Sequence, residues 1–371
     1  MTKKRCLSAL CLLLTLTLLI LAPRLLQRGD SQVPGLTGND RTLLRIWVLS
    51  APGGGQAWLT AQLKQFERQY PGLSTYLRTV TPADLADPEA VWPDVLLCMP
   101  GDLTDPATLQ PLTGAMLSQG TLRQELLRCG RWQGEQYALP LCWGAWVLAI
   151  DSALEPGSAA TPAPTTLLGK PAASPDAQAT AEPGYPLAAA AQAACPLQSP
   201  DGAALFTLGL LTDALPPLPV DFAALSSAEV YSAFRSRRCA TAMLTSGQLT
   251  AFTALTSGGS GFPFRVMAAE EIITDQVWLA GIPEGAAPEA ALLLSFLTSV
   301  PAQEALARQA LHTVRADLTL YAAGTAAQLE RAARRSLSAV NAFVPAGTVA
   351  DAAWQFLQDR CTLAEALLPL L

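Results

Sequence analysis

The sequence predicts an α/β fold, and three observations lead to that class. Residues 45–80 read as a strand, a glycine-rich turn, an amphipathic helix, a Pro-Gly breaker and a second strand. Further apolar runs of strand length alternate with helical patterns, an alternation typical of a mainly parallel sheet. The chain has 371 residues, which suffices for two lobes, each with its own core.

The first helix is predicted over Leu59–Tyr70. Apolar residues recur there at helical spacing with charged residues between them, so one face packs on a sheet and the other meets water. Pro71 and Gly72 end this helix and turn the chain back.

The strands around this helix place two loops at the same edge of the predicted sheet. The expected strands are Leu43–Leu49, Tyr76–Val80 and Val95–Met99. Ligands of parallel α/β sheets collect at the carboxyl ends of the strands. We therefore expect ligand contacts from the loops Ser50–Gln56 and Pro100–Asp105.

The middle of the chain contains a change of lobe and a change of composition. A long apolar run within residues 131–151 follows Pro140 and is long enough to leave one lobe and enter another. Residues 155–184 are rich in Ala and Pro, which predicts a poorly ordered loop.

Helical and strand patterns return after this loop. Cys239–Thr245 is predicted as a short strand, and Ser246, Gly247 and Gln248 as its exit. The other predicted elements are helices at Leu205–Leu215, Ser226–Ser236 and Pro288–Leu311, a strand at Gln276–Pro283, and a closing helix pair at Ala350–Leu371 in which Thr362 begins a capping box with Glu365. His312 is expected to cap the end of the long helix.

The N-terminus has the pattern of an export segment. Lys3, Lys4 and Arg5 precede an apolar run from Leu7 to Ala22. This run is near signal-peptide length and shorter than the roughly 20 residues of a full membrane span. Residues 1–30 are therefore predicted to be a signal peptide or an uncleaved membrane anchor, with the rest of the chain outside the cell membrane.

Charge and residue inventory exclude several classes of function. The chain carries a net charge of −6, which argues against nucleic acid or anionic surfaces as partners. It has one histidine and no CxxC, HExxH or G-x-S-x-G pattern, so no metal, cofactor or catalytic site is expected. The cysteine spacings fit no disulfide framework, and buried free thiols are the simpler interpretation.

An ordered set of segments resembles one protein family. The set comprises RIWVLS, FERQYPGLSTYLRTV, PDVLLCMPGDL, LQPLTG, GEQYALPLCWGAWVLAID, FRSRRCATAMLTSGQ and the run from VWLAGIPEGA to HTVRADL. Together these segments resemble the extracellular solute-binding proteins of ABC importers, of the sugar-binding type (family 1). No single segment is diagnostic, whereas their order and spacing over about residues 42–150 and 231–371 are fairly specific.

The resemblance implies a periplasmic-binding-protein-like fold of two lobes joined by a hinge, with a solute held in the cleft between them. Lobe 1 would comprise residues 42–150 and 277–312, and lobe 2 residues 151–276 and 313–371. The implied function is delivery of a small polar solute, a carbohydrate above all, to ABC permease subunits by a monomeric, exported, non-enzymatic protein. The Ala/Pro-rich region and the absence of a tryptophan soon after Gly247 depart from the family pattern.

Candidate ligand-binding residues follow from residue chemistry and position. Sugar-binding clefts combine aromatic faces with polar side chains and the free amides of glycine loops. The candidates are Ser50, Gly54 and Asp102 from the first lobe, Trp143 at the hinge, Ser246, Gly247 and Gln248 from the second lobe, and Trp278 as a further aromatic. Core packing is the competing interpretation for each tryptophan, and a simple turn is the competing interpretation for the Gly53–Gly55 run.

A second function from another class stays open. The Ala/Pro-rich region and the leader without a clear cleavage site also fit a membrane-anchored interaction or sensor protein that keeps the solute-binding fold without transport. The sequence identifies neither the solute nor the fate of the leader.

Overall fold

The computed structural model describes residues 41–87, 91–114, 121–152, 202–211, 227–237, 241–357 and 360–371. The described residues from 43 onward belong to one compact unit. The predicted leader and the predicted loop at 155–184 lie outside the described residues.

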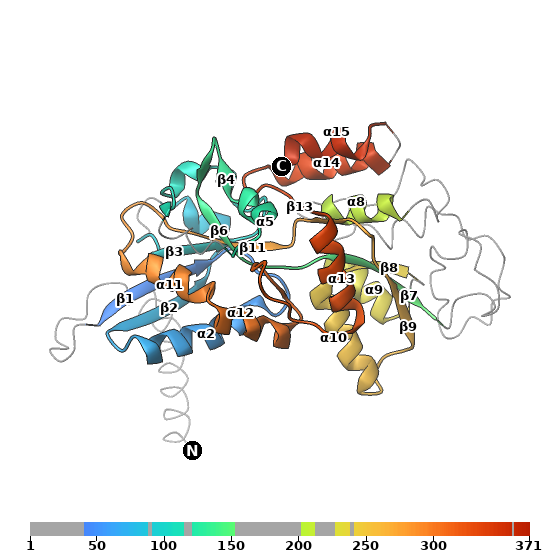
Figure 1. Ribbon diagram of the computed structural model, residues 1–371, viewed down its shortest axis with the longest axis horizontal. Coiled ribbons are helices and arrows are strands. Elements are labelled where there is room, and N and C mark those ends of the chain that lie inside the picture. The colour runs from blue at the N-terminus through green and yellow to red at the C-terminus, as the bar shows by residue number, and fades with distance from the viewer. Residues whose placement is uncertain are drawn as a thin grey trace, which may run out of the picture. The chain divides into compact units, whose positions relative to one another are not determined.

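A six-stranded sheet contains the first predicted strands (Figure 1). Its order is β12-β6-β11-β3-β1-β2. The bounds are β1 Thr42–Val48, β2 Leu73–Thr79, β3 Val95–Cys98, β6 Ala138–Trp143, β11 Val277–Gly281 and β12 His312–Thr313. The strands predicted at residues 43–49, 76–80, 95–99 and 276–283 are confirmed as β1, β2, β3 and β11.

The strand directions correct the expectation of a mainly parallel sheet. β1 and β3 are parallel. However, β11 runs antiparallel to both β3 and β6, and β12 runs antiparallel to β6. The sheet is therefore mixed, because the chain re-enters it from segments far along the sequence.

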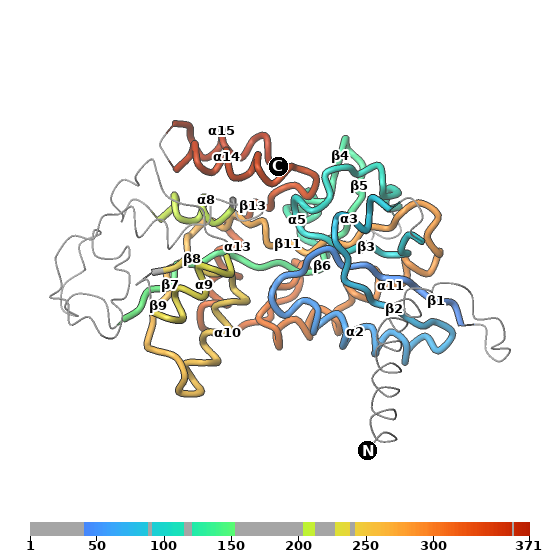
Figure 2. Tube along the Cα trace, turned by 180° about the vertical axis from the view of Figure 1, so that it is seen from behind, coloured from blue at the N-terminus to red at the C-terminus, as the bar shows by residue number. Residues whose placement is uncertain are grey.

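Helices cover this sheet on two sides. Helix α2 (Gly55–Gln69) buries Trp58, Leu59, Leu63 and Phe66 at helical spacing, and the Phe66 ring meets Phe296 of α11 (Glu289–Leu297) at 5.4 Å between centroids. Helix α5 (Gln124–Cys129) and the hairpin β4 (Arg131–Trp132) and β5 (Glu135–Gln136) lie on the other side (Figure 2). The helix α3 (Pro82–Leu85) and the 3-10 turn η2 (Pro106–Thr108) complete this part.

A second, three-stranded sheet has the order β8-β7-β9. Its strands are β7 (Trp146–Asp151), β8 (Thr241–Thr245) and β9 (Phe264–Met267), and all neighbours are antiparallel. Helices α9 (Ser227–Arg235) and α10 (Ser246–Ser257) pack on β8. Most of β7 lies within the range predicted for lobe 1, yet it pairs only with strands of the other predicted lobe.

The chain passes between the two sheets at short segments. Gly144 and Ala145 separate β6 of the larger sheet from β7 of the three-stranded sheet. Asp275 and Gln276 separate β11 of the larger sheet from β10 (Ile272–Thr274), which lies in a two-stranded sheet and follows β9 along the chain. Gly144 N donates to Gln276 O at 2.7 Å, which ties the two passages together. The division into two lobes at the predicted boundaries stays a prediction.

The C-terminal part contains both strands and helices. β13 (Leu337–Ala339) pairs in parallel with β10. The helices are α8 (Gly202–Leu210), α13 (Gly324–Arg335), α14 (Ala346–Leu357) and α15 (Leu363–Leu367), followed by the 3-10 turn η5 (Leu368–Leu370). The predicted closing helix pair is confirmed as α14 and α15, and Thr362 and Glu365 form the predicted capping box.

Two predictions for residues 288–312 are wrong. The segment forms α11, α12 (Val300–Glu304) and the 3-10 turn η4 (Ala305–Gln309) instead of one long helix, because Pro301 lies near the start of a new helix. His312 does not cap a helix but pairs with Trp143 in the sheet.

The core is continuous around the larger sheet, and a second cluster lies where α8, α14 and α15 pack together. Four cysteines lie within the described ranges and are free: Cys98, Cys129 and Cys142 are buried, and Cys361 is half-buried. Within the described ranges, no single helix has the length and apolar character of a membrane span. One bent pair, Glu289–Leu297 with Val300–Gln309, meets that test together with a bend of 52°.

Candidate functional site

Hydrogen bonds connect three of the candidates, Ser50, Asp102 and Trp278, near the carboxyl ends of β1 and β3. Ser50 Oγ donates to the Asp102 carboxylate, which also accepts from Met99 N at 2.8 Å. Trp278 Nε1 donates to Ser50 O at 2.9 Å. Burial raises the pKa of Asp102, and the hydrogen bonds from Met99 and Ser50 oppose that rise. The hydrogen bond between Ser50 and Asp102 thus connects the loops after β1 and β3.

The glycine loop before α2 meets the first turn of α10. Gly54 is the N-cap of α2 and has φ 85°, a left-handed conformation that glycine adopts without strain. A Cβ atom added at Gly247 would lie 3.2 Å from both Gly53 Cα and Gly53 O. The absence of side chains therefore lets the loop after β1 touch the first turn of α10. The candidate Gly247 lies in this contact, and the candidate Gly54 is the chain neighbour of Gly53.

The remaining second-sheet candidates have structural partners. Ala145 N donates to Ser246 Oγ at 3.3 Å, and Ser246 N donates to Ala145 O at 2.9 Å. Gln248 accepts from Thr245 N at 3.0 Å and donates to Ser227 Oγ at 2.8 Å. Gln248 is thus part of the capping box that begins α10, where the sequence predicted only an exit from a strand.

Both candidate tryptophans belong to the core. Trp143 and Trp278 have no exposed surface. Trp143 Nε1 donates to Thr313 O at 2.9 Å, and Trp278 packs its ring against Trp58 at 6.2 Å between centroids. Ligand contact by either residue stays a prediction, and it would require the surrounding elements to move.

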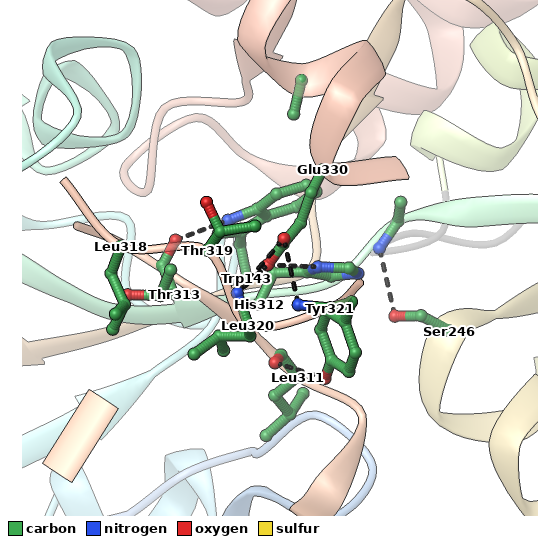
Figure 3. Close-up of polar contacts among 12 residues, drawn as sticks. Trp143, Ser246, Leu311, His312, Thr313, Leu318, Thr319, Leu320, Tyr321 and Glu330 are labelled. Atoms are coloured by element: carbon green, nitrogen blue, oxygen red, sulfur yellow. Dashed lines mark hydrogen bonds and ion pairs between the residues drawn. The ribbon is translucent and has the colours of Figure 1, made fainter. Parts of the chain in front are cut away.

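A buried cluster surrounds the only histidine of the chain (Figure 3). The His312 ring stacks on Trp143 at 4.4 Å and meets Tyr321 edge-on at 5.3 Å. Its Nδ1 lies 3.7 Å from Glu330 Oε1, beyond hydrogen-bond distance. Within the described part of the chain neither ring nitrogen has a hydrogen-bond partner. Burial lowers the pKa of His312, and Glu330 opposes that change, so the neutral ring fits this pocket.

A groove of about 760 Å³ lies along one face of α10 and begins at Ser246. Its walls come from α10, β9, Ala310 after η4, and the start of α13. Apart from Ser246, none of its residues is a sequence candidate. Hydroxyl residues recur at helical spacing, at Ser246, Thr250, Thr253 and Ser257. This spacing in the sequence predicts that one face of the helix is polar.

The described residues do not meet the requirements of a metal site. Within the described ranges, no group of three or more His, Cys, Asp or Glu side chains could hold a metal ion.

Comparison by sequence finds no relative: no family profile and no curated protein matches the chain. Comparison by structure finds many. The GacH receptor of Streptomyces glaucescens, solved unliganded and with acarbose, matches with a TM-score of 0.60 at 13% identity over 88% of this chain and 95% of that one. Maltose-bound MalE3 of T. maritima matches with a TM-score of 0.54 at 15% identity over 88% and 97%.

An ABC substrate-binding protein from Listeria monocytogenes, in complex with cycloalternan, gives a TM-score of 0.54 at 14% identity over 88% of this chain and 96% of that one. At this level of identity the likeness establishes the fold. The chain therefore has the two-sheet α/β fold found in the sugar-binding substrate-binding proteins of ABC importers.

Proposed function

We propose that the protein is an extracytoplasmic solute-binding protein that delivers a carbohydrate to an ABC permease in the membrane. The observation that carries this proposal is the meeting of Gly53 and Gly247, where the loop after β1 touches the first turn of α10 without side chains between them. Two sheet-based bodies joined by short passages can close on a solute by hinge motion. The sugars held by structurally similar proteins, such as acarbose and maltose, support a carbohydrate as the solute.

The proposal extends to location and partners. The charged start and apolar run of residues 1–30 would export the chain and either be removed or hold it at the outer face of the membrane. The protein would act as a monomer, bind no nucleic acid, and present its closed form to the permease subunits. It would catalyse no reaction.

The test is a thermal-shift screen of the purified protein against sugars, polyols, amino acids and inorganic anions. A ligand that binds only the folded state stabilises it by about 2.7 kcal/mol at 100 times its Kd. We expect an increase in Tm with neutral sugars and none with amino acids or anions. No shift with any sugar, in protein shown to be folded by circular dichroism, would contradict the proposal and favour the interaction or sensor protein.

A further inference from the structure

We infer that the groove along α10 is a binding site for a neutral oligosaccharide, distinct from the junction of Gly53 and Gly247. This inference rests on the proposed function and adds a site to it. The groove volume of about 760 Å³ falls within the range of about 300–1,000 Å³ typical of small-molecule sites. Gly247 and Gln248 do not line it, so it occupies a different side of α10 from the glycine contact.

A row of hydroxyl groups forms one wall. Ser246, Thr250, Thr253 and Ser257 lie on one face because their spacings of three and four residues match the helical period. Thr250 Oγ1 donates to Ser246 O at 3.0 Å, and Thr253 Oγ1 donates to Leu249 O at 2.8 Å. The hydroxyl protons of Thr250 and Thr253 are thus used within the helix, and the lone pairs of these two oxygens remain to accept hydrogen bonds from a ligand.

The start of α13 forms another wall of the groove. The groove is lined there by Gly324, Thr325 and Ala326, in the first turn of α13, and by Gln328. The first backbone N–H groups of a helix have no partner inside it, and no side chain caps α13 at its N-cap, Ala323. A sugar hydroxyl both donates and accepts, so it can bridge the two walls.

The apolar lining suits the C–H faces of a sugar ring. Phe264 of β9 is half-buried and is held by an edge contact with Phe252 at 5.0 Å between centroids. Leu249, Val266 and Leu329 add aliphatic surface. Pockets that combine an aromatic face with a few placed polar groups are typical of small-molecule sites.

The charges in the groove favour a neutral ligand. Among the described residues that line it, none is Asp, Glu or Lys, and Arg265 is the one charged side chain. Arg265 already takes part in an interaction within the chain. A cationic ligand would therefore find no counter-charge, and an anion would have to compete with the existing partner of Arg265.

The experiment measures binding of maltose, mannobiose and cellobiose to the full-length protein by isothermal titration calorimetry, in a detergent without a sugar head group. Thr253→Trp places an indole in the groove at an exposed position, and Ala251→Trp places one on the same helix at an exposed position outside it. We expect Thr253→Trp to weaken binding of the best disaccharide at least tenfold, or to remove one of two binding events. Ala251→Trp should bind as the wild type does.

The possible results separate the inference from the proposed function. Equal affinity and stoichiometry in Thr253→Trp and the wild type would overturn the groove as a site while leaving sugar binding intact. Tighter binding of glucuronate than of any neutral disaccharide would overturn the neutral class of ligand. Failure of the wild type to bind any sugar would overturn the proposed function together with this inference.

Discussion

Asp275 is a fully buried carboxyl group in the short segment between β10 and β11. Its Oδ1 accepts from Trp146 Nε1 at 2.8 Å and from Gln276 Nε2 at 3.0 Å, and its Oδ2 accepts from Ala203 N at 3.2 Å. Burial raises its pKa to about 6, and these hydrogen bonds oppose the rise without cancelling it. The folded state therefore holds the Asp275 proton more tightly than the unfolded chain does.

This shift predicts a pH-dependent term in the free energy of unfolding. The stability that Asp275 contributes is fully present below its ordinary pKa of 3.8 and is lost as the pH rises through about 6. The loss is on the order of 3 kcal/mol. Asparagine has no titrating proton. Between pH 4 and pH 7.5 the free energy of unfolding of Asp275→Asn, measured by urea unfolding, should therefore rise by about this amount relative to that of the wild type.

Asp317→Asn is the matched control for this measurement. Asp317 pairs with Arg315 at 2.8 Å, and that contact lowers the pKa of Asp317. Its stabilising effect is therefore lost as the pH falls, which is the opposite sign. A free-energy difference between Asp275→Asn and the wild type that stays constant from pH 4 to pH 7.5 would contradict the raised pKa.

At the scale of single residues, the sequence brings some of the candidate residues together, and their contact with a ligand stays a prediction. Ser50 and Asp102 were predicted from strand ends, and they do bind each other. Trp143 and Trp278 are both fully buried, and an aromatic residue beside a hinge has the same local sequence whether it faces a cleft or a core. Only the packing of distant residues such as His312 separates the two cases.

Helix α10 carries both the contact of Gly247 with Gly53 and one wall of the groove. It begins with a capping box in which Thr245 and Gln248 bond to each other. Gln248 N donates to Thr245 Oγ1 at 3.2 Å, and Thr245 N donates to Gln248 Oε1 at 3.0 Å. We expect Thr245→Ala to lower the free energy of unfolding by about 1 kcal/mol, because one backbone donor loses its partner. Hydrogen exchange should show faster exchange of the first amides of α10.

Thr362→Ala removes the equivalent cap of α15 and serves as the comparison. Exchange should increase in α15 and stay unchanged in α10. If Thr245→Ala left exchange in α10 unchanged, the cap would not hold the start of that helix.

Element boundaries could be predicted wherever the signal is local. The T-x-x-E pattern at Thr362 predicted a helix start correctly, and the same spacing at Thr245 and Gln248 carried the same signal. The short strands β10, β12 and β13 have two or three residues. They exist only because distant segments pair with them, and a pattern of two or three residues is too short to show a period.

At the scale of the whole molecule, the contact between Gly53 and Gly247 limits how closely the loop after β1 approaches the first turn of α10. Gly247→Ala adds a methyl group 3.2 Å from the Gly53 backbone, and backbone on both sides cannot turn away as a flexible side chain would. We expect a loss of stability of about 1–3 kcal/mol from overpacking. Hydrogen exchange of the loop before α2 should increase, and urea unfolding should measure the energy.

Gly347→Ala provides the control. Gly347 lies in α14, and a Cβ atom there would meet nothing within 4 Å. Alanine is the better helix former, so this variant should be neutral or more stable by up to about 1 kcal/mol. Equal destabilisation by both substitutions would mean that the Gly53 contact has no special role.

The position of the only histidine has a practical consequence for magnetic resonance. A chain with one imidazole gives one set of ring-proton signals, and the Trp143 ring stacked 4.4 Å away displaces those signals through its ring current. Tyr321 and Glu330 reach the same ring from a loop and from α13. The protein therefore carries a built-in spectroscopic reporter at the edge of its larger sheet. A sugar titration followed on this one resonance would reveal whether β12 and α13 move, without any attached label.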